Sequence, residues 1–97
     1  MMIQSFGDPI TEEFFHSGTL PGKGCGWRAQ KSVVARKLDM LDAASHLIDL
    51  RSPPGNKLKK LSGDLDEMYS IRINDQWRLL FVWTEEGPTQ VQVIDYH

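Results

Sequence analysis

Arg78 is the residue whose type and position point most directly to chemistry. It is the only charged residue between Trp77 and Trp83, in a segment otherwise made of large apolar side chains. A charge in that position must reach solvent, pair with an acid or hold a ligand, because a bare buried charge is very unfavourable. The planar guanidinium suits bidentate binding of a phosphate. A structural ion pair explains the pattern equally well, and the candidate acids are Asp75, Glu85 and Asp95.

The last three residues place an acid, a phenol and an imidazole together at the end of a predicted strand: Asp95, Tyr96 and His97. Histidine has the unperturbed pKa nearest to physiological pH, which suits general acid or base catalysis. A tyrosine can stack on a base or position a proton. Strand alternation sends Asp95 and His97 to one face and Tyr96 to the other. The alternative is a frayed, solvated terminus without a role.

The basic residues are grouped although the chain as a whole is mildly acidic. Eleven basic and thirteen acidic residues give a net charge of −2, yet no acid lies between residues 23 and 38 or between residues 51 and 60. These two blocks contain Lys23, Arg28, Lys31, Arg36 and Lys37, and then Arg51, Lys57, Lys59 and Lys60. Such blocks favour a surface that binds a polyanion, and solvated lysine-rich loops are the alternative.

The composition predicts one soluble domain over residues 1–97. The chain has 40% hydrophobic and 25% charged residues, which excludes extended disorder. It contains no apolar run of bilayer length, and its first residues do not resemble a signal peptide, so we expect a cytoplasmic protein. The single cysteine, Cys25, and the isolated His16 and His46 offer no ligand spacing for a metal. We therefore expect no metal and no cofactor.

The first half of the chain has helical character. We expect a short strand at residues 2–6, a brief helix with Thr11 as its N-cap, and a mobile glycine-rich loop at residues 17–26. From Arg28 onward, apolar residues recur at helical spacing through Leu41 and as far as Ile48. The sequence allows a break between residues 43 and 46. Two prolines at positions 53 and 54 then end this helix.

The second half of the chain has strand character. Side chains of two kinds alternate over residues 69–73, and residues 77–83 and 89–96 are two further short segments with strand character. Short turns separate the three segments. Consecutive strands with short connections form an antiparallel meander. The predicted fold is therefore α+β, with the long helix covering one face of the sheet.

These candidates together suit one kind of reaction. They comprise cations for a phosphate, a possible acid or base and two aromatic rings, Tyr69 and Tyr96, without a carboxylate cluster for a metal. Cleavage of RNA without a metal needs such groups, because the 2′-hydroxyl proton must be removed and the charged transition state stabilised.

Four motifs resemble those of the HigB toxins, a branch of the RelE/ParE superfamily. They are Arg-Ser-Pro-Pro-Gly-Asn-Lys-Leu at residues 51–58, Leu-Ser-Gly-Asp at 61–64, Ser-Ile-Arg-Ile-Asn-Asp-Gln-Trp-Arg at 70–78, and Asp-Tyr-His at 95–97. A helical segment at residues 37–44 is also similar, and the resemblance spans nearly the whole chain apart from the glycine-rich loop.

This resemblance implies a fold, an activity and partners. The implied fold has an N-terminal strand and helices packed on an antiparallel sheet that ends in a three-strand meander. The implied protein is the toxin of a type II toxin–antitoxin system, a ribosome-dependent mRNA interferase that cuts messenger by 2′-hydroxyl attack in the decoding site. Implied partners are the 70S ribosome with mRNA, a HigA-type helix-turn-helix antitoxin, and operator DNA only through the antitoxin complex. We expect the acids Asp39, Asp42 and Asp49 to offer one docking surface for the antitoxin.

The resemblance also assigns roles to residues. Arg78 matches the phosphate-binding arginine of the family, and Asp95, Tyr96 and His97 match its C-terminal active-site string. Some members carry a histidine where this chain has Lys59 and Lys60, so Lys59 would have to bind phosphate or transfer a proton. Further expected RNA contacts are Arg51, Lys57, Lys60, Tyr69 and Arg72. The competing class is a toxin of the same fold that acts without cleavage, on DNA gyrase or on ribosome assembly.

Overall fold

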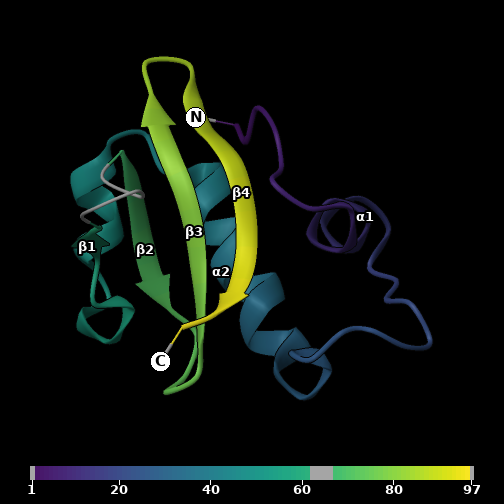
Figure 1. Cartoon of the computed structure of the whole chain (residues 1–97). Coiled ribbons are helices and arrows are strands. Elements are labelled where there is room, and N and C mark those ends of the chain that lie inside the picture. The colour runs from purple at the N-terminus through teal and green to yellow at the C-terminus, as the bar shows by residue number, and fades with distance from the viewer. Residues whose placement is uncertain (1, 62–66, 97) are drawn as a thin grey trace.

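Helices and an antiparallel sheet form the two layers of the molecule (Figure 1). The structure is a computed structural model, and it describes residues 2–61 and 67–96. The helices of this part are α1 (Pro9–Ser17) and α2 (Lys31–Ala43), with the short 3-10 helices η1 (Arg28–Gln30), η2 (Leu47–Arg51) and η3 (Pro54–Asn56). The strands are β1 (Lys59–Lys60), β2 (Met68–Arg72), β3 (Trp77–Thr84) and β4 (Gly87–Asp95).

The sheet is antiparallel throughout, in the order β1-β2-β3-β4. This confirms the predicted meander and adds β1, which the sequence pattern had placed in a loop. The register sets Arg72 opposite Arg78, and Arg78 opposite Ile94. The end of β2, the start of β3 and the end of β4 therefore lie at one end of the sheet, where the C-terminus is also found (Figure 1).

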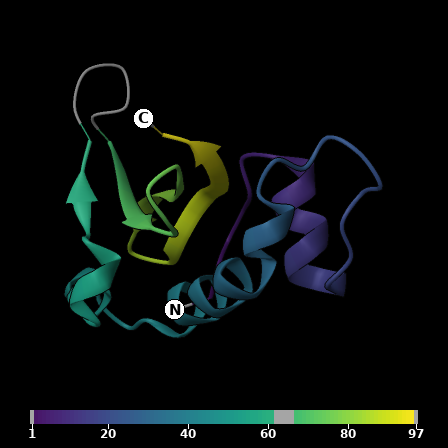
Figure 2. The same ribbon diagram turned by 90° about the horizontal axis from the view of Figure 1, so that it is seen from below.

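The two faces of the sheet have different surroundings. One face packs against α2 and α1, and Leu38, Leu41, Ile71 and Phe81 are buried in the core between them. Figure 2 shows this layer of helices along one side of the twisted sheet. The other face carries a smaller apolar cluster in which Leu61, Met68 and Leu80 are buried beside Val82, Ile94 and Tyr96. We call this second surface the open face.

The predicted long helix is interrupted, as the sequence allowed. The helix α2 ends at Ala43, and Ala44 has an extended backbone with ψ 133° before η2 begins at Leu47. This break changes which residues face the core. Ile48, expected on the apolar face, is 63% exposed, whereas Leu50 is fully buried. The expectation for Ile48 was wrong because the helical period does not continue across Ala44.

The N-terminal segment differs from the predicted strand. Among the described residues, only Phe6 forms a bridge, parallel to Val91 of β4. Backbone hydrogen bonds join Gly7 N to Val91 O and Val91 N to Ser5 O, at 2.8 and 3.1 Å. The spacing shifts at Gln90, which has a left-handed backbone with φ 54°, and the next backbone hydrogen bond runs from Gln4 N to Pro88 O at 2.8 Å.

The helix α1 begins earlier than predicted. Asp8, not Thr11, is its N-cap, and the Asp8 carboxylate accepts hydrogen bonds from the backbone N and the hydroxyl of Thr11 at 2.7 and 2.8 Å. Pro9 occupies the first helical position, where its missing N–H costs nothing. Thr11 is therefore a buried residue of the first turn. The helix ends at Gly18, whose left-handed backbone (φ 76°) directs its N–H to Phe14 O.

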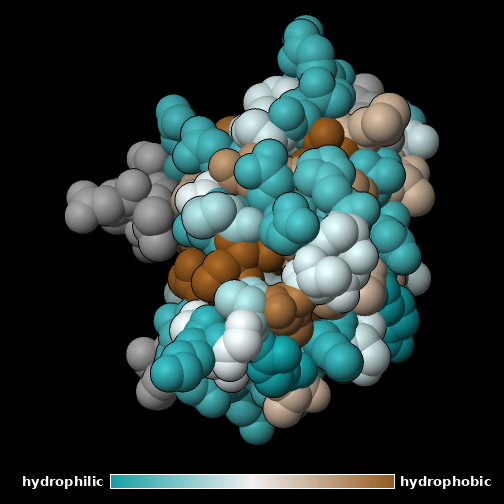
Figure 3. All heavy atoms as spheres, turned by 90° about the vertical axis from the view of Figure 1, so that its right-hand side faces the viewer, coloured by the Kyte–Doolittle hydropathy of each residue, from teal (hydrophilic) through white to brown (hydrophobic). Residues whose placement is uncertain are grey.

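The segment between α1 and η1 is irregular, as expected, but it is not detached from the core. Leu20 and Cys25 are half-buried and pack against the core, and Trp27 is 4% exposed. The surface on this side is mostly hydrophilic, with small separate hydrophobic areas (Figure 3). The predicted mobility of residues 17–26 stays a prediction. Within the described ranges, no helix is long and apolar enough to span a membrane.

Two of the acids expected to dock an antitoxin have contacts inside the chain. Asp42 Oδ1 accepts a hydrogen bond from Ile3 N at 2.9 Å. The Asp49 carboxylate accepts from the backbone N atoms of Ser45 and His46 and so closes the first turn of η2. Asp42 therefore ties the N-terminal segment to α2, Asp49 stabilises local structure, and a docking role for this surface stays a prediction.

Candidate phosphate-binding site on the open face

Arg78 lies on the open face, half-buried, with its guanidinium held from two sides. Its Nε donates a hydrogen bond to Ser70 Oγ at 2.8 Å, and its Nη2 donates to the backbone oxygen of Lys57 at 2.8 Å. Ser70 is fully buried, so its hydroxyl is a fixed acceptor. Within the described part of the chain, Nη1 has no hydrogen-bond partner. The guanidinium is therefore oriented and keeps donor capacity for a ligand.

The ring of Tyr96 connects Arg78 with Lys59. The Arg78 Cζ atom and the Lys59 Nζ atom each lie 5.7 Å from the centre of this ring, within the range of cation–π interactions. Lys59 reaches this position because β1 pairs with β2 and sets Lys59 opposite Ser70. The short strand that the sequence pattern missed is what brings the lysine to the arginine.

Arg72 is the fourth member of this group, because it stands directly opposite Arg78 in the register of β2 and β3. Like charges in that arrangement repel one another. Arg72 is partly neutralised by Asp75, whose Oδ1 lies 2.5 Å from Arg72 Nη2. Lys59, Arg72, Arg78 and Tyr96 are called the Arg78 cluster below. Two of its cations, Lys59 and Arg78, lie near the Tyr96 ring, and Arg72 stands opposite Arg78, which is an arrangement that favours an anionic ligand.

The surroundings of Arg78 act on its pKa in opposite directions. Burial lowers the pKa most, the phenol of Tyr96 raises it, and the positive charge of Arg72 lowers it further. Arginine is nevertheless protonated at any physiological pH, because its ordinary pKa is so high. Arg78 is therefore a permanent cation whose hydration is already reduced, and binding a phosphate would restore the lost contacts.

The alternative role of Arg78, a structural ion pair, finds little support in these contacts. The described hydrogen bonds of its guanidinium go to a hydroxyl and to backbone carbonyl oxygens. Asp75, one of the candidate acids, pairs with Arg72 instead. Asp95 accepts a hydrogen bond from Gln76 Nε2 at 2.9 Å.

The remaining predicted site residues are not brought together with the Arg78 cluster. Tyr69 faces the helix layer and stacks on Phe81 with ring centres 6.2 Å apart, and Lys60 stands opposite Tyr69. Arg51 is exposed at the end of η2 and has no described contact with the cluster. Lys57 contributes its backbone oxygen, while its side chain is exposed. His97 lies outside the described residues.

Ser70 was not singled out by the sequence pattern, although a signal for it existed. It is a small polar residue between apolar ones, and the turn at residues 74–76 fixes the register of the hairpin. In that register Ser70 is the diagonal neighbour of Arg78 on the same face, close enough for a long side chain to reach. Pairing the two predicted strands would have identified this hydroxyl as the acceptor for Arg78.

Lys37 was also misplaced, because it was counted in a basic surface block. Its side chain is only 6% exposed, and its ammonium donates a hydrogen bond to Asn56 Oδ1. Burial lowers the pKa of Lys37 most, and the positive charges of Arg36 and Arg72 lower it further. The position within α2 could have indicated this, since Lys37 precedes the buried Leu38 and follows the buried Val34 by three residues.

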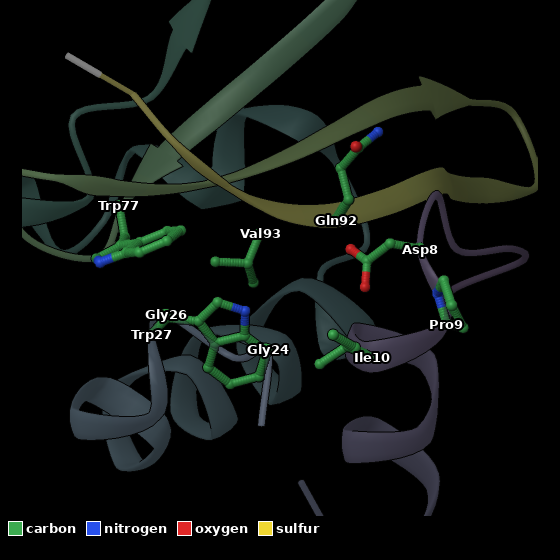
Figure 4. Close-up of a pocket in the computed structure, with 9 residues that line it drawn as sticks. All are labelled: Asp8, Pro9, Ile10, Gly24, Gly26, Trp27, Trp77, Gln92 and Val93. Carbon is green, nitrogen blue, oxygen red and sulfur yellow. The ribbon is translucent and has the colours of Figure 1, made fainter. Parts of the chain in front are cut away.

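A separate cleft lies on the other side of β4, between the strand and the start of α1. Its volume is about 270 Å³, and its walls include Trp27, Trp77, Val93 and Asp8. Figure 4 shows Val93 pointing into the cleft and the two indole rings on one side of it. None of the cations of the Arg78 cluster lines it. Elsewhere in the described ranges, no three His, Cys, Asp or Glu side chains are grouped so that they could hold a metal ion.

Two helices packed on one face of a four-stranded antiparallel sheet form an α+β arrangement consistent with the RelE-like toxin fold. Comparison with known proteins gives the family. Residues 4–97 match the HigB-like toxin family, described as RelE-like toxins of the type II toxin–antitoxin system HigB. Because this match covers nearly all of the sequence, the chain belongs to that family.

Two individual relatives match parts of the chain. The protein named Toxin HigB-1 of Vibrio cholerae is 47% identical over 55 residues, which are 57% of this chain and 58% of that protein. An uncharacterized protein of Haemophilus influenzae is 51% identical over 49 residues, 50% of this chain and 48% of that protein. The matched segments thus span about half the length of these relatives.

Proposed function

We propose that this protein is a ribosome-dependent mRNA interferase that arrests translation. The observation that carries the proposal is the Arg78 cluster, in which an oriented guanidinium with an open donor edge lies beside a second cation and an aromatic ring. Membership of a family of RelE-like toxins supports the same conclusion.

The chemistry follows from these groups. The 2′-hydroxyl of one nucleotide attacks the adjacent phosphorus and expels the 5′-oxygen of the next nucleotide, leaving a cyclic phosphate and a 5′-hydroxyl. Arg78 binds the scissile phosphate and stabilises the charge that builds up on its oxygens. Tyr96 offers a face on which a splayed base can stack. Lys59, whose Nζ atom lies 5.7 Å from the centre of the same ring, adds positive charge.

Proton transfer needs one group to accept the 2′-hydroxyl proton and another to protonate the leaving oxygen. We assign these roles to Lys59 and His97, without deciding which of them is the base. We propose that Asp95, at the end of β4, helps to position the C-terminal residues. Its carboxylate accepts a hydrogen bond from Gln76 Nε2, in the turn before β3. No metal ion takes part in this scheme.

Dependence on the ribosome follows from the charge of the protein. Affinity for free nucleic acid grows with the number of phosphates neutralised and falls steeply with salt. A net charge of −2 with a cluster of three cations is too little to grip free RNA firmly. The ribosome would compensate for this weak affinity by presenting the messenger in a fixed conformation. Because ribosomes are cytoplasmic, the protein would act in the cytoplasm.

The proposed partner is an antitoxin of the HigA type with a helix-turn-helix domain. A protein that arrests translation has to be held inactive, so a tight complex is expected. Operator DNA would be bound only through that complex.

The test is cleavage of messenger in a purified translation system, mapped by primer extension. We expect cuts in ribosome-bound messenger, negligible cleavage of the same RNA without ribosomes, and no magnesium requirement beyond that of the ribosome. Expression should stop growth, and co-expression with the neighbouring open reading frame should restore it. Efficient cleavage of naked RNA, or normal growth at verified high expression, would contradict the proposal. Growth arrest without new messenger ends would instead favour a non-nucleolytic toxin.

A further inference from the structure

A buried polar pair lies behind the loop that holds Arg78. Lys37 of α2 and Asn56 of η3 are 6% and 0% exposed. The Lys37 ammonium donates to Asn56 Oδ1, and Asn56 Nδ2 donates to the backbone oxygens of Leu50 and Ser52 at 3.0 and 3.3 Å. The oxygen and the nitrogen of the amide are both used. One side chain thus ties two points of the turn between η2 and η3 to α2.

The residue after Asn56 supplies the carbonyl that holds Arg78. Lys57 has a left-handed backbone with φ 47° and ψ 54°, a conformation that a non-glycine residue keeps only when its surroundings hold it there. Its backbone N donates to Pro54 O at 3.1 Å, and its backbone oxygen accepts from Arg78 Nη2. The place of this carbonyl therefore depends on the turn that Asn56 anchors.

We propose that Lys37 and Asn56 are positioning residues for Arg78, because they hold the Lys57 carbonyl against which the guanidinium is oriented. The part of this proposal that concerns the cleavage rate rests on the proposed function. Neither residue would touch RNA, since both are buried, so they act only through Arg78. The line of contacts runs from α2 through the amide of Asn56 to the peptide of Lys57 and then to the guanidinium.

Stability alone does not explain a polar pair in this position. A buried ammonium without a carboxylate partner is costly, and a well-packed apolar pair of similar size is often at least as stable. The described hydrogen bond of Lys37 goes to a neutral amide, and the charges of Arg36 and Arg72 act against it. The polar pair fixes the orientation of the Asn56 side chain and of the turn bound to it, since the amide oxygen and the amide hydrogens can find their partners in only one orientation.

The first experiment observes Arg78 in the protein alone. We would record the nitrogen–hydrogen resonance of the Arg78 Nε group by NMR, assigned through its loss in Arg78→Lys. Asn56→Ala should shift this resonance and speed its exchange with water severalfold, because the Nη2 contact with Lys57 is loosened. The control is Val91→Ala, which truncates a fully buried core residue of β4 that has no described contact with this network. It should leave the resonance unchanged.

The second experiment measures single-turnover cleavage on programmed ribosomes, well below the melting temperature of each variant. Asn56→Ala and Lys37→Met should each lower the rate about tenfold, which corresponds to about 1.4 kcal/mol. In an Arg78→Ala background the same changes should cause no further loss. Asn56→Asp keeps an acceptor for Lys37 but cannot donate to the carbonyl oxygens of Leu50 and Ser52, so its rate should fall as well.

The two arms separate the positioning proposal from the proposed function. An unchanged Arg78 resonance in Asn56→Ala, or rate losses that add to that of Arg78→Ala, would overturn the positioning role. If the wild-type protein does not cleave messenger, the proposed function fails while the resonance still decides on positioning. If Asn56→Ala does not fold, Lys37→Met and Asn56→Asp provide the same two measurements.

Discussion

Arg78 and Lys37 are two cations that the fold withdraws from water. They differ in whether a hydrogen-bond donor of the side chain remains available to a ligand. Burial is the largest cause that lowers the pKa of each. Arg78 is fixed by Ser70 and by the Lys57 carbonyl, yet one of its nitrogens has no partner in the described part of the chain. Lys37 is enclosed, and its ammonium bonds to Asn56. An oriented cation with an open donor edge can bind an anionic ligand, whereas an enclosed cation can only hold other parts of the protein in place.

The largest expected effect comes from removing the open cation. Arg78→Ala should leave a folded protein and lower the cleavage rate roughly 10²–10³-fold, as for loss of one preorganised donor. The free energy of unfolding should fall by only about 1 kcal/mol, since the hydroxyl of Ser70 loses its partner. Single-turnover cleavage and chemical denaturation measure the two quantities. A large loss of stability with normal cleavage would mean that Arg78 has a structural role only.

Deleting His97 tests whether the terminus belongs to the same catalytic group. A chain end contributes little to stability, so the melting temperature should stay within error. The cleavage rate should fall at least tenfold, because a proton-transfer group is lost. Lys59→Ala, measured beside it, should show a similar or smaller loss. Wild-type cleavage by the deletion variant would confine the active site to the Arg78 cluster.

A smaller effect is expected at the Tyr96 ring, which connects Arg78 with Lys59. Tyr96→Leu removes the aromatic face between Arg78 and Lys59, and cation–π contacts at such sites contribute about 0.5–1 kcal/mol each. The rate should fall severalfold. Tyr96→Phe is the matched control, because it keeps the ring and removes only the hydroxyl. Equal losses in the two variants would show that the phenol, and not the ring face, is the active part.

The smallest effect concerns the enclosed cation and appears in the pH dependence of stability. Because folding lowers the pKa of Lys37 below its ordinary value of 10.5, the unfolded chain binds more protons than the folded one at pH values between the two pKa values. Stability should therefore rise with pH through that window and level off above 10.5. Lys37→Met lacks this titration, so the difference in unfolding free energy should move in favour of the wild type as the pH approaches 10.5. A constant difference would show that Lys37 is not desolvated in solution.

Much of the architecture could be predicted from local pattern. Short segments of strand character between turns, in the second half of the chain, located the three strands of the meander, and the short turns made them antiparallel. The two prolines were expected to end the long helix, but α2 already ends at Ala43, and Pro54 begins the short 3-10 helix η3. The break near residue 44 was allowed for. Capping was harder, because Asp8 and Thr11 are both good N-cap residues and only the position of Pro9 decides between them.

The sequence by itself determined the class of fold and singled out Arg78 as a candidate, because both depend on residue types and short spacings. It could not say which charged residues share a face. The pairing of β1 with β2 brings Lys59 to Tyr96, and the packing of α2 against the turn between η2 and η3 buries Lys37. Both results require residues nineteen or more positions apart to meet, namely Lys37 with Asn56 and Lys59 with Tyr96. Tertiary structure alone sets such distances, because local propensity carries no information about which distant segments pack together.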